Sequence, residues 1–254
     1  MMISAHATHP GLVRKNNEDY IRIDDDLGIY MLADGIGGHN AGEVASALAV
    51  ETVYAVLRSN IAHTEVDSYF ELMVHAMQTA HWEISSKAIT NSSFAKMGTT
   101  LIVAILRENK AYIVHAGDSR CYLFRNEPQP RTASSLKRER NRLRRLTNDH
   151  TVGEQRLASG VPIEQIPKKK FHTLTQSVGP GDPPYPDFRI VGFRKGDLLL
   201  ICSDGLTDML TDVEIEAVLA NRDACLDTLA GNLIDAANLN GGRDNISVVL
   251  VTSP

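Results

Sequence analysis

The order of predicted elements places this 254-residue chain in the α+β class. Short runs rich in β-branched and aromatic residues come first, two amphipathic helices follow, strands resume, and two further helices precede a last strand. Only a few residues connect the central strands, which permits antiparallel hairpins and excludes parallel crossovers. We therefore predict antiparallel sheets with helices on their outer faces.

The first half of the chain carries two predicted strands and two predicted helices. The strands cover residues 20–24 and 28–33. The first helix opens at Asn40, with Glu43 as its capping-box partner, and continues with apolar residues at helical intervals. The second helix has a clearer apolar stripe over residues 70–88, which predicts that one face is buried.

The second half returns to strands and then to helices. Turn residues such as Glu108-Asn109 and Gly117-Asp118 separate β-branched runs and predict hairpins. The predicted elements are strands at residues 99–106, 110–115, 120–124 and 197–203, a helix capped by Thr211 and Glu214, a helix with an apolar stripe from Leu226 to Ile234, and a strand at residues 246–251.

Bulk composition favours a soluble globular protein. Hydrophobic residues make up 43% of the chain, and no repeat or linker divides it, so we predict one domain over residues 1–254. The net charge of -5 gives no general attraction for nucleic acid or an anionic membrane. No leader is visible, and no apolar run approaches the roughly 18 residues of a membrane span. Three scattered cysteines are typical of the cytoplasm. We expect a cytoplasmic monomer.

Acidic residues recur where an apolar strand meets a glycine-rich turn. Any one such Asp-Gly segment by itself is typical of an ordinary turn. Together they predict a shared cluster, which is costly to bury unless cations compensate its charge. Mg²⁺ and Mn²⁺ are hard cations that prefer such oxygen ligands. The residues are Glu18, Asp19, Asp34, Asp118, Asp204 and Asp244.

Seven segments carry a family resemblance, in family order and over nearly the whole chain. They are LVRKNNED (12–19), LADGIGGHNAGEVAS (32–46), MGTTL (97–101), HAGDSRCYL (115–123), LTNDHT (146–151), SDGLTD (203–208) and GGRDNISVVLV (241–251). In these segments the chain resembles the metal-dependent phosphatases of the protein phosphatase 2C (PP2C) family, and its compact bacterial members above all. The resemblance implies a PP2C-like β-sandwich of two antiparallel sheets flanked by helical pairs.

The resemblance also implies an activity, which is hydrolysis of phosphoserine and phosphothreonine in proteins. The attacking water would be activated between two divalent cations, Mn²⁺ or Mg²⁺. By resemblance, Asp34 bridges the two ions and Gly35 offers its carbonyl to one of them. Glu18 would help to bind that ion, while Asp204 and Asp244 hold the other.

Four further residues take supporting roles in the same resemblance. Asp118 would contribute to a third, weaker ion site, and Asp19 would orient the attacking water beside the catalytic Asp34. Asn245 would steady the turn after the last ligand. Arg14 matches the arginine that clamps the substrate phosphate, because a guanidinium presents paired donors to two phosphate oxygens.

The chain departs from eukaryotic relatives at the position after Asp-Gly. There they carry a histidine thought to act as general acid, whereas this chain has Ile36. We expect His39 to be structural and assign no side chain as general acid. A metal-bound water is the expected proton donor.

Two segments in the middle of the chain are less regular. Residues 128–145 form a predicted insertion, and its basic tract at 137–145 is expected to be a solvated loop or short exposed helix. A docking patch for acidic or phosphorylated partners is the functional alternative. Residues 152–187 correspond to the family's flap beside the active site, and their proline and glycine content predicts an irregular loop.

Alternatives remain open at this point. No Cys-x5-Arg segment and no GxxxxGK[ST] loop is present, which excludes cysteine-nucleophile phosphatases and gives no support to P-loop hydrolases. The expected partners are phosphorylated proteins, namely a Ser/Thr kinase and its substrates, without nucleic acid or membrane. The same chemistry could serve a regulator that dephosphorylates an anti-anti-sigma factor. The other class of function is a catalytically silent binding module of the same fold.

Overall fold

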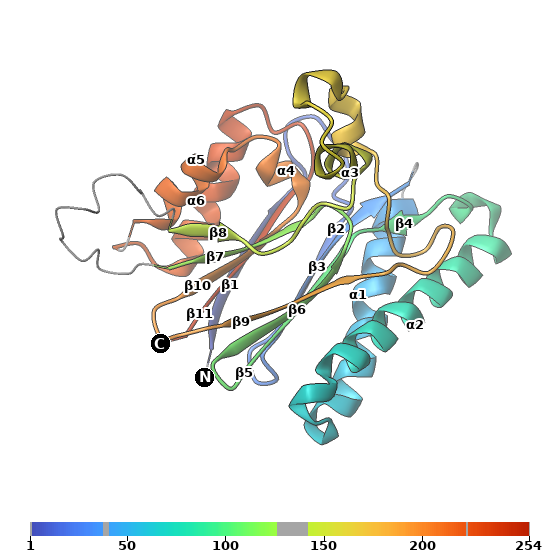
Figure 1. Cartoon of the computed structure of the whole chain (residues 1–254), viewed down its shortest axis with the longest axis horizontal. Helices are drawn as coiled ribbons and strands as arrows, with labels where there is room; N and C mark the ends of the chain where they lie inside the picture. Colours follow the sequence, from blue (N-terminus) through green and yellow to red (C-terminus); the bar gives the residue numbers. More distant parts are fainter. Residues whose placement is uncertain (1, 38–40, 126–141, 222, 254) are drawn as a thin grey trace.

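Two antiparallel sheets face each other, and a layer of helices covers the outer face of each (Figure 1). The computed structural model describes residues 2–37, 41–125, 142–221 and 223–253. Helices α1 (Ala41–Asn60) and α2 (Tyr69–Thr90) cover one sheet, and α5 (Asp212–Leu219) and α6 (Leu226–Leu239) cover the other. This arrangement confirms the predicted α+β sandwich. No helix formed by the described residues is long and apolar enough to cross a membrane.

The first sheet combines the two ends of the chain. Its strands, in spatial order, are β1 (Ile3–His9), β11 (Ile246–Thr252), β10 (Leu198–Cys202), β7 (Arg120–Phe124) and β8 (Leu143–Arg145). The sequence analysis did not predict β1, whose alternation of small and polar residues is weak. It forms because all its residues pair with β11.

Strand β8 corrects part of the prediction for the basic tract. Residues 143–145 were expected to lie in a solvated loop or short helix, but they pair with β7 at the edge of the first sheet. Leu143 is 5% exposed and packs with the apolar residues beneath α5 and α6. The gain from burying Leu143 explains why the strand forms here. Residues 128–141 of the predicted insertion lie outside the described residues.

The second sheet is built from the middle of the chain. Its strands, in order, are β2 (Asp19–Asp24), β3 (Ile29–Ile36), β5 (Leu101–Arg107), β6 (Lys110–Ala116) and β9 (Asp187–Gly192), and the short β4 (Gly98–Thr99) pairs with β3. Strand β9 was missed, because no element was predicted between the end of the flap at residue 187 and the strand starting at residue 197. Its pairing with β6 gives the sheet its last edge.

Helices α1, α2, α5 and α6 agree with the predicted helices, whereas the helix at Val152–Ala158 corrects the irregular loop predicted for residues 152–187. It begins after Thr151, whose side chain accepts the Glu154 N–H and caps the helix. The Thr211–Glu214 capping box is present at the start of α5, whereas the predicted start at Asn40 lies outside the described residues. The α-helices are α1 (Ala41–Asn60), α2 (Tyr69–Thr90), α3 (Val152–Ala158), α4 (Asp204–Thr207), α5 (Asp212–Leu219) and α6 (Leu226–Leu239). Single 3-10 turns lie at Ile61–His63, Val66–Ser68, Ser92–Phe94, Ile163–Gln165 and Lys168–His172.

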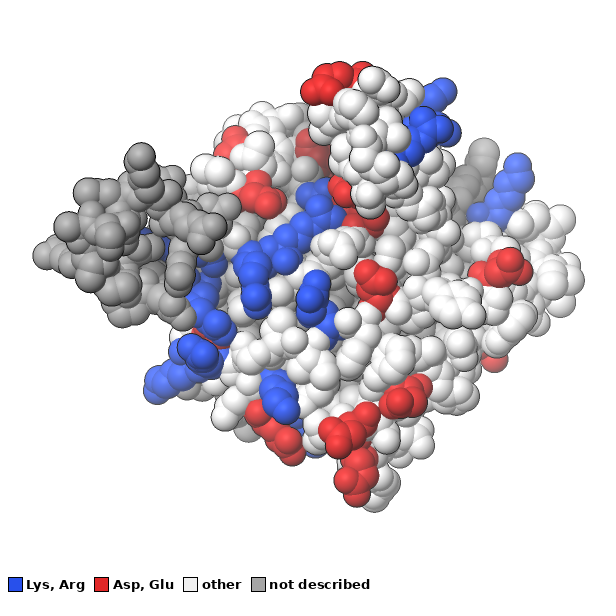
Figure 2. All heavy atoms as spheres, viewed as in Figure 1, with Lys and Arg blue, Asp and Glu red and all other residues white. Residues whose placement is uncertain are grey.

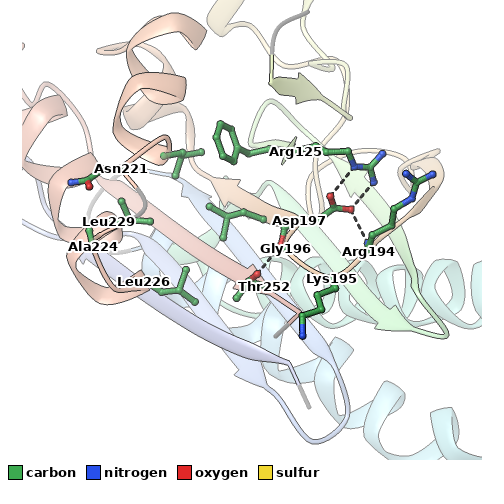
Figure 3. A pocket seen from close by; sticks show the side chains of 13 residues that line it. Arg125, Arg194, Lys195, Gly196, Asp197, Asn221, Ala224, Leu226, Leu229 and Thr252 are labelled. Atoms are coloured by element: carbon green, nitrogen blue, oxygen red, sulfur yellow. Dashed lines mark hydrogen bonds and ion pairs between the residues drawn. The ribbon is translucent and has the colours of Figure 1, made fainter. Parts of the chain in front are cut away.

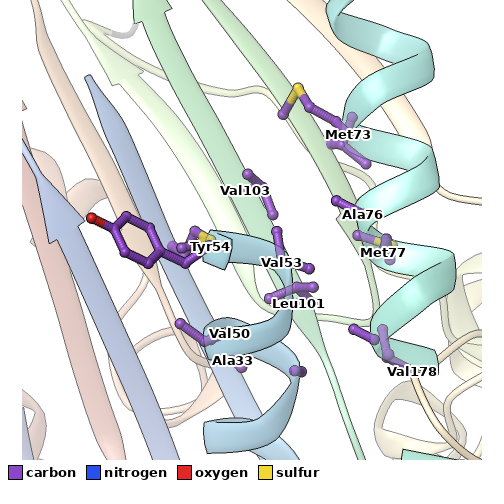
Figure 4. Close-up of a cluster of buried hydrophobic side chains, with 14 of the residues drawn as sticks. Ala33, Val50, Val53, Tyr54, Met73, Ala76, Met77, Leu101, Val103 and Val178 are labelled. Atoms are coloured by element: carbon purple, nitrogen blue, oxygen red, sulfur yellow. The ribbon is translucent and has the colours of Figure 1, made fainter. Parts of the chain in front are cut away.

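Three apolar layers hold the sandwich together. Figure 4 shows the layer between the second sheet and its helices, where Val53 of α1 and Met73 and Met77 of α2 lie near Leu101 and Val103 of β5. A second layer fills the space between the sheets, and a third lies under α5 and α6. Burial of each large apolar side chain contributes about 1.5–3 kcal/mol. The rigid sandwich thereby fixes the positions of its strand ends.

Candidate active site

The start of β2 and the end of β3 bring two carboxylates directly opposite each other. Asp19 and Asp34 are partners in the antiparallel register of these strands. The backbone around Asp34 is held by Thr100, whose hydroxyl accepts from the Asp34 N–H at 3.0 Å and whose own N–H donates to the Asp34 carbonyl. Ser203 donates to Oδ2 of Asp19 at 2.9 Å. Both aspartates are therefore fixed by the sheet rather than by a loop.

The loop before β2 and the first turn of α1 pack closely on Asp34's neighbour, Gly35. The Gly35 N–H donates to the carbonyl of Glu18, and a Cβ on Gly35 would lie 2.3 Å from the carbonyl oxygen of Gly42. A Cβ on Gly42 would lie 2.6 Å from Oε2 of Glu18. Only glycine fits at these two positions, so the Glu18 carboxylate lies close to the Gly35 backbone.

A third group comes from the junction of β10 with α4 and from the turn before β11. Asp204 is the first residue of α4. A Cβ on Gly205 would lie 2.0 Å from the carbonyl oxygen of Asn245, so the two turns are in direct contact. Asp244 precedes Asn245 and accepts its N–H through Oδ1 at 2.9 Å. The predicted pair Asp204 and Asp244 is thus held together by backbone packing.

Asn245 connects this turn to the loop before β2. Its Oδ1 accepts from the Glu18 N–H at 2.8 Å, and its Nδ2 donates to the carbonyls of Pro10 and Asn16. The side chain is 4% exposed. It therefore sets the position of Glu18 relative to Asp244, which is a larger role than the predicted steadying of one turn.

Burial and mutual repulsion raise the pKa values of the clustered carboxylates. Burial is the largest cause in each case, and neighbouring carboxylates add to it. The pKa values of Asp34 and Asp204 lie well above their ordinary value, and those of Asp19 and Asp118 rise to about 6. Glu18 also has a raised pKa. The structure brings these side chains into one cluster in which they destabilise one another's charge.

Two oxygens of the cluster have no hydrogen-bond partner among the described residues. They are Oδ1 of Asp19 and Oδ1 of Asp204, and both are buried. A buried acceptor without a partner carries its full desolvation penalty. The donor set therefore fits hard divalent cations, which bind carboxylate oxygens and remove that penalty.

Arg14 lies at the rim of this cluster. Its Nη2 donates to Oδ2 of Asp244 at 2.7 Å, and its side chain is 57% exposed. The predicted phosphate-clamping residue thus pairs with a predicted metal ligand in this structure. Ile36 is exposed at the end of β3, and His39 lies outside the described residues.

Comparison with known families identifies the chain. The family model for protein phosphatase 2C matches residues 13–232. The chain belongs to the protein phosphatase 2C family. The family predicted from the sequence is confirmed.

Similar proteins agree over nearly the full chain. The serine/threonine phosphatase stp of Listeria monocytogenes is 33% identical over 96% of this chain and 93% of its own. The serine/threonine phosphatase structure of S. agalactiae has a TM-score of 0.85 at 30% identity and covers 100% of both chains. The catalytic domain of PstP, solved with 2 manganese ions, has a TM-score of 0.80 at 29% identity and covers 99% of this chain and 97% of that one. This chain is therefore a protein serine/threonine phosphatase of the bacterial type, as predicted.

A pocket of about 250 Å³ lies between the phosphatase's carboxylate cluster and its predicted flap. Asp118 and Asp204 line it together with Lys168 and His172. Asp208 also lines it, and its Oδ2 lies 3.5 Å from Nδ1 of His172. The sequence analysis missed Asp208, although its position four residues after Asp204 in a short helical segment could have indicated a shared face.

A buried carboxylate that lines this pocket, Asp149, was also missed. Asp149 accepts from Nε and Nη2 of Arg120 and from Arg145. Its side chain is 7% exposed. The arginines compensate its charge within the chain, so Asp149 is a buried ion pair rather than a free ligand.

Two stacked histidines lie next to the backbone of Gly117. The rings of His115 and His150 are 4.6 Å apart, and Nε2 of His150 lies 3.6 Å from Oδ1 of Asp187. Nδ1 of His150 accepts the N–H of Gly117 at 3.3 Å, so the neutral ring carries its proton on Nε2. That proton faces Asp187 beyond hydrogen-bond distance, and Nε2 has no hydrogen-bond partner among the described residues.

Proposed function

We propose that this phosphatase hydrolyses phosphoserine and phosphothreonine in proteins with the help of two divalent cations, Mn²⁺ or Mg²⁺, held by the carboxylate cluster. The observation that carries the proposal is the convergence of half-buried carboxylates that raise one another's pKa values, with Arg14 at the rim and Arg120 beside Asp118 as the cations near them among the described residues. Placing these carboxylates together costs free energy in the metal-free protein, and bound cations offset that cost.

The ligands are assigned residue by residue. Asp34 would contact both ions, with the Gly35 carbonyl and Glu18 serving one of them. Asp204 and Asp244 would hold the other, supported by the contact between their turns. When bound, the ions lower the pKa of water toward neutrality and supply positive charge to the phosphoryl oxygens.

A third ion is part of the proposal. Asp118 and Asp204 would hold it, as predicted, and the pocket adds Asp208 as a further carboxylate. His172, Asp204 and Asp208 offer ligand atoms within 4.8 Å of one another. This site would face the flap.

The chain's own side chains position the reactants. Ser203 fixes Oδ2 of Asp19 and leaves Oδ1 to accept a hydrogen bond from the attacking water. Arg14 would exchange its ion pair with Asp244 for two parallel hydrogen bonds to the substrate phosphate. Because Ile36 occupies the position of the eukaryotic histidine, no side chain is assigned as proton donor, and a water held at the ion site would supply the proton to the leaving alkoxide.

The biological setting follows from the same chemistry. We propose that the phosphatase opposes a Ser/Thr kinase, acts on that kinase and its substrates, and works as a cytoplasmic monomer. The name of the Listeria monocytogenes relative as a serine/threonine phosphatase supports the substrate class.

Release of inorganic phosphate from a phosphothreonine peptide tests the proposal. We expect turnover with Mn²⁺ or Mg²⁺ and none after chelation by EDTA, with recovery when the metal is restored. A protein that binds the peptide but releases no phosphate with either metal would be a silent binding module instead. Equal turnover with and without EDTA would refute the two-ion mechanism.

A further inference from the structure

Basic residues gather on one face of an otherwise acidic chain. Figure 2 looks onto β8 and β9 and shows Lys and Arg side chains there, between the predicted flap and the lower edge of the molecule. The net charge of the chain is -5, so this concentration runs against its overall charge. We call this surface the cationic face, and it consists of Arg142, Arg144, Arg189, Arg194 and Lys195, all of which are exposed.

The two strands of the cationic face are the edges of the two sheets. Arg144 of β8 pairs with Leu123, and Arg189 of β9 pairs with Ile113. Leu123 and Ile113 both belong to the apolar layer between the sheets. Residues that are directly opposite in a sheet share a face, so both arginines point toward the open side of the sandwich, where the edges of the two sheets meet.

Acidic residues near the cationic face already form ion pairs with arginines, or are fewer than the arginines around them. Arg120 and Arg145 share Asp149, which leaves one positive charge in excess. Asp197 is paired with Arg125, which also donates to the Gly192 carbonyl and thereby ties β7 to β9. Among the described residues, no ion pair involves Arg142, Arg144, Arg189 or Lys195. The remaining acid on β9, Asp187, lies against His150.

One end of the cationic face reaches the active site. Arg144 is followed by Arg145, which binds Asp149. Asp149 also binds Arg120, and these two residues line the pocket that contains Asp118 and Asp204. A substrate with its phosphate at the carboxylate cluster would therefore have neighbouring residues over β8.

The other end of the cationic face borders a second cavity. It has a volume of about 480 Å³, with Arg194 and Lys195 on one side and the apolar side chains of Leu226 and Leu229 on the other (Figure 3). A protein partner can place an apolar side chain there while its acidic residues contact the arginines, whereas a nucleic acid has no such side chain.

We propose that the cationic face binds an acidic segment of the phosphoprotein substrate, and this inference rests on the phosphatase activity proposed above. Charge complementarity supports the choice of partner, because a cationic surface attracts carboxylates and raises the rate of productive encounter. The face would select substrates by sequence outside the phosphorylated residue, which the metal chemistry by itself does not do.

Phosphothreonine peptides with acidic or neutral flanks test the proposal, and p-nitrophenyl phosphate serves as a substrate without flanks. We expect the wild type to prefer the acidic peptide in kcat/KM, with the preference falling as salt is raised. The double variant Arg144→Glu/Arg189→Glu should lose about 10-fold in kcat/KM for the acidic peptide through a raised KM. Its activity on p-nitrophenyl phosphate and on the neutral peptide should not change.

Two further double variants serve as controls for the charge-reversal variant. Arg58→Glu/Lys96→Glu changes the net charge equally, at exposed residues at the end of α1 and after α2, and should preserve the preference. Arg144→Gln/Arg189→Gln removes the charges without reversing them and should give a smaller loss. It replaces the first double variant if that protein does not fold.

Several results would overturn the inference. One is a wild type without preference for the acidic peptide, and another is a double variant that retains the preference. Charged residues also protect sheet edges from pairing, so a double variant that dimerises with its preference intact would assign the arginines to edge protection. Competition by a single-stranded oligonucleotide as strong as that by the acidic peptide would indicate a general polyanion surface.

The experiment also separates the inference from the proposed function. A wild type inactive on p-nitrophenyl phosphate with Mn²⁺ would refute the proposed function. Fluorescence anisotropy of the labelled acidic peptide then measures binding to the cationic face directly. A loss of that binding in the double variant supports the inference, and equal binding overturns it.

Discussion

Two groups of carboxylates with low exposure differ in what compensates their charge in this phosphatase. Asp149 and Asp197 are each bound by arginines, with Nη2 of Arg120 2.8 Å from Asp149 and Nη2 of Arg125 2.6 Å from Asp197. Asp34 and Asp204 instead face other carboxylates, which raise their pKa values beyond the effect of burial.

This difference distinguishes carboxylates with a structural role from carboxylates with a functional role. A carboxylate that the chain compensates with its own arginine is part of the folded framework, and its loss leaves a buried cation. A carboxylate without such a partner lowers the stability of the metal-free protein. It has a favourable interaction only when a metal cation binds. The two groups should therefore respond in opposite ways to substitution, pH and metal.

The largest effect should come from Asp34→Asn. Loss of one charge between the two proposed ions should lower kcat on the order of 10³-fold. The metal-free protein should melt at the same or a higher temperature, because the substitution removes a charge that its neighbours repel. Phosphate release and differential scanning fluorimetry measure both results, and activity equal to that of the wild type would refute the assignment of Asp34.

Asp149→Ala should instead lower the stability of the metal-free protein. Arg120 would be left as a buried cation, so the free energy of unfolding should fall by about 3–5 kcal/mol. Urea denaturation of the metal-free protein measures this change. The exposed Asp26 provides the control, since Asp26→Ala should cost less than about 0.5 kcal/mol. Equal effects of the two substitutions would contradict the buried ion pair.

The stability of the metal-free protein should fall as the pH rises. The pKa values of Asp19 and Asp118 are raised to about 6 in the folded protein, above the ordinary 3.8. The folded state therefore binds more protons than the unfolded state between about pH 4 and 6, and stability is lost as these groups ionise. The melting temperature should be higher near pH 5 than near pH 7.5.

Added Mn²⁺ should reverse that trend, because the ions bind the ionised carboxylates and stabilise the folded state by mass action. The gain in melting temperature with Mn²⁺ should be larger near pH 7.5 than near pH 5. A gain that is the same at both values would contradict a cluster held by its ionised carboxylates.

The smallest effect should come from Arg14→Ala. The side chain is more than half exposed, so loss of its ion pair with Asp244 should change stability little. Loss of paired donors to the phosphate should raise KM by about 10-fold and lower kcat less. Arg14→Lys should recover only part of the affinity, and a fall in kcat with unchanged KM would place Arg14 elsewhere in the mechanism.

Much of the carboxylate site could be predicted because its signals are local. Asp34 and Asp204 each follow a buried apolar run and precede a glycine, and close backbone packing at Gly35 and Gly205 requires that glycine. The compensated group has no such signal. Arg120 and Asp149 are 29 residues apart, and only the pairing of β7 with the neighbouring segment brings them together.

Periodicity and ordered segments in the chain were sufficient for the α+β class, the main helices, most strands and the family. They act through neighbours in sequence, where helical and strand spacing fix which side chains share a face. The pairing of β1 with β11, the edge strands β8 and β9, and the cationic face depend on contacts between distant segments. Only the tertiary structure decided which of these distant segments lie together, because strand pairing and burial depend on partners that no local pattern specifies.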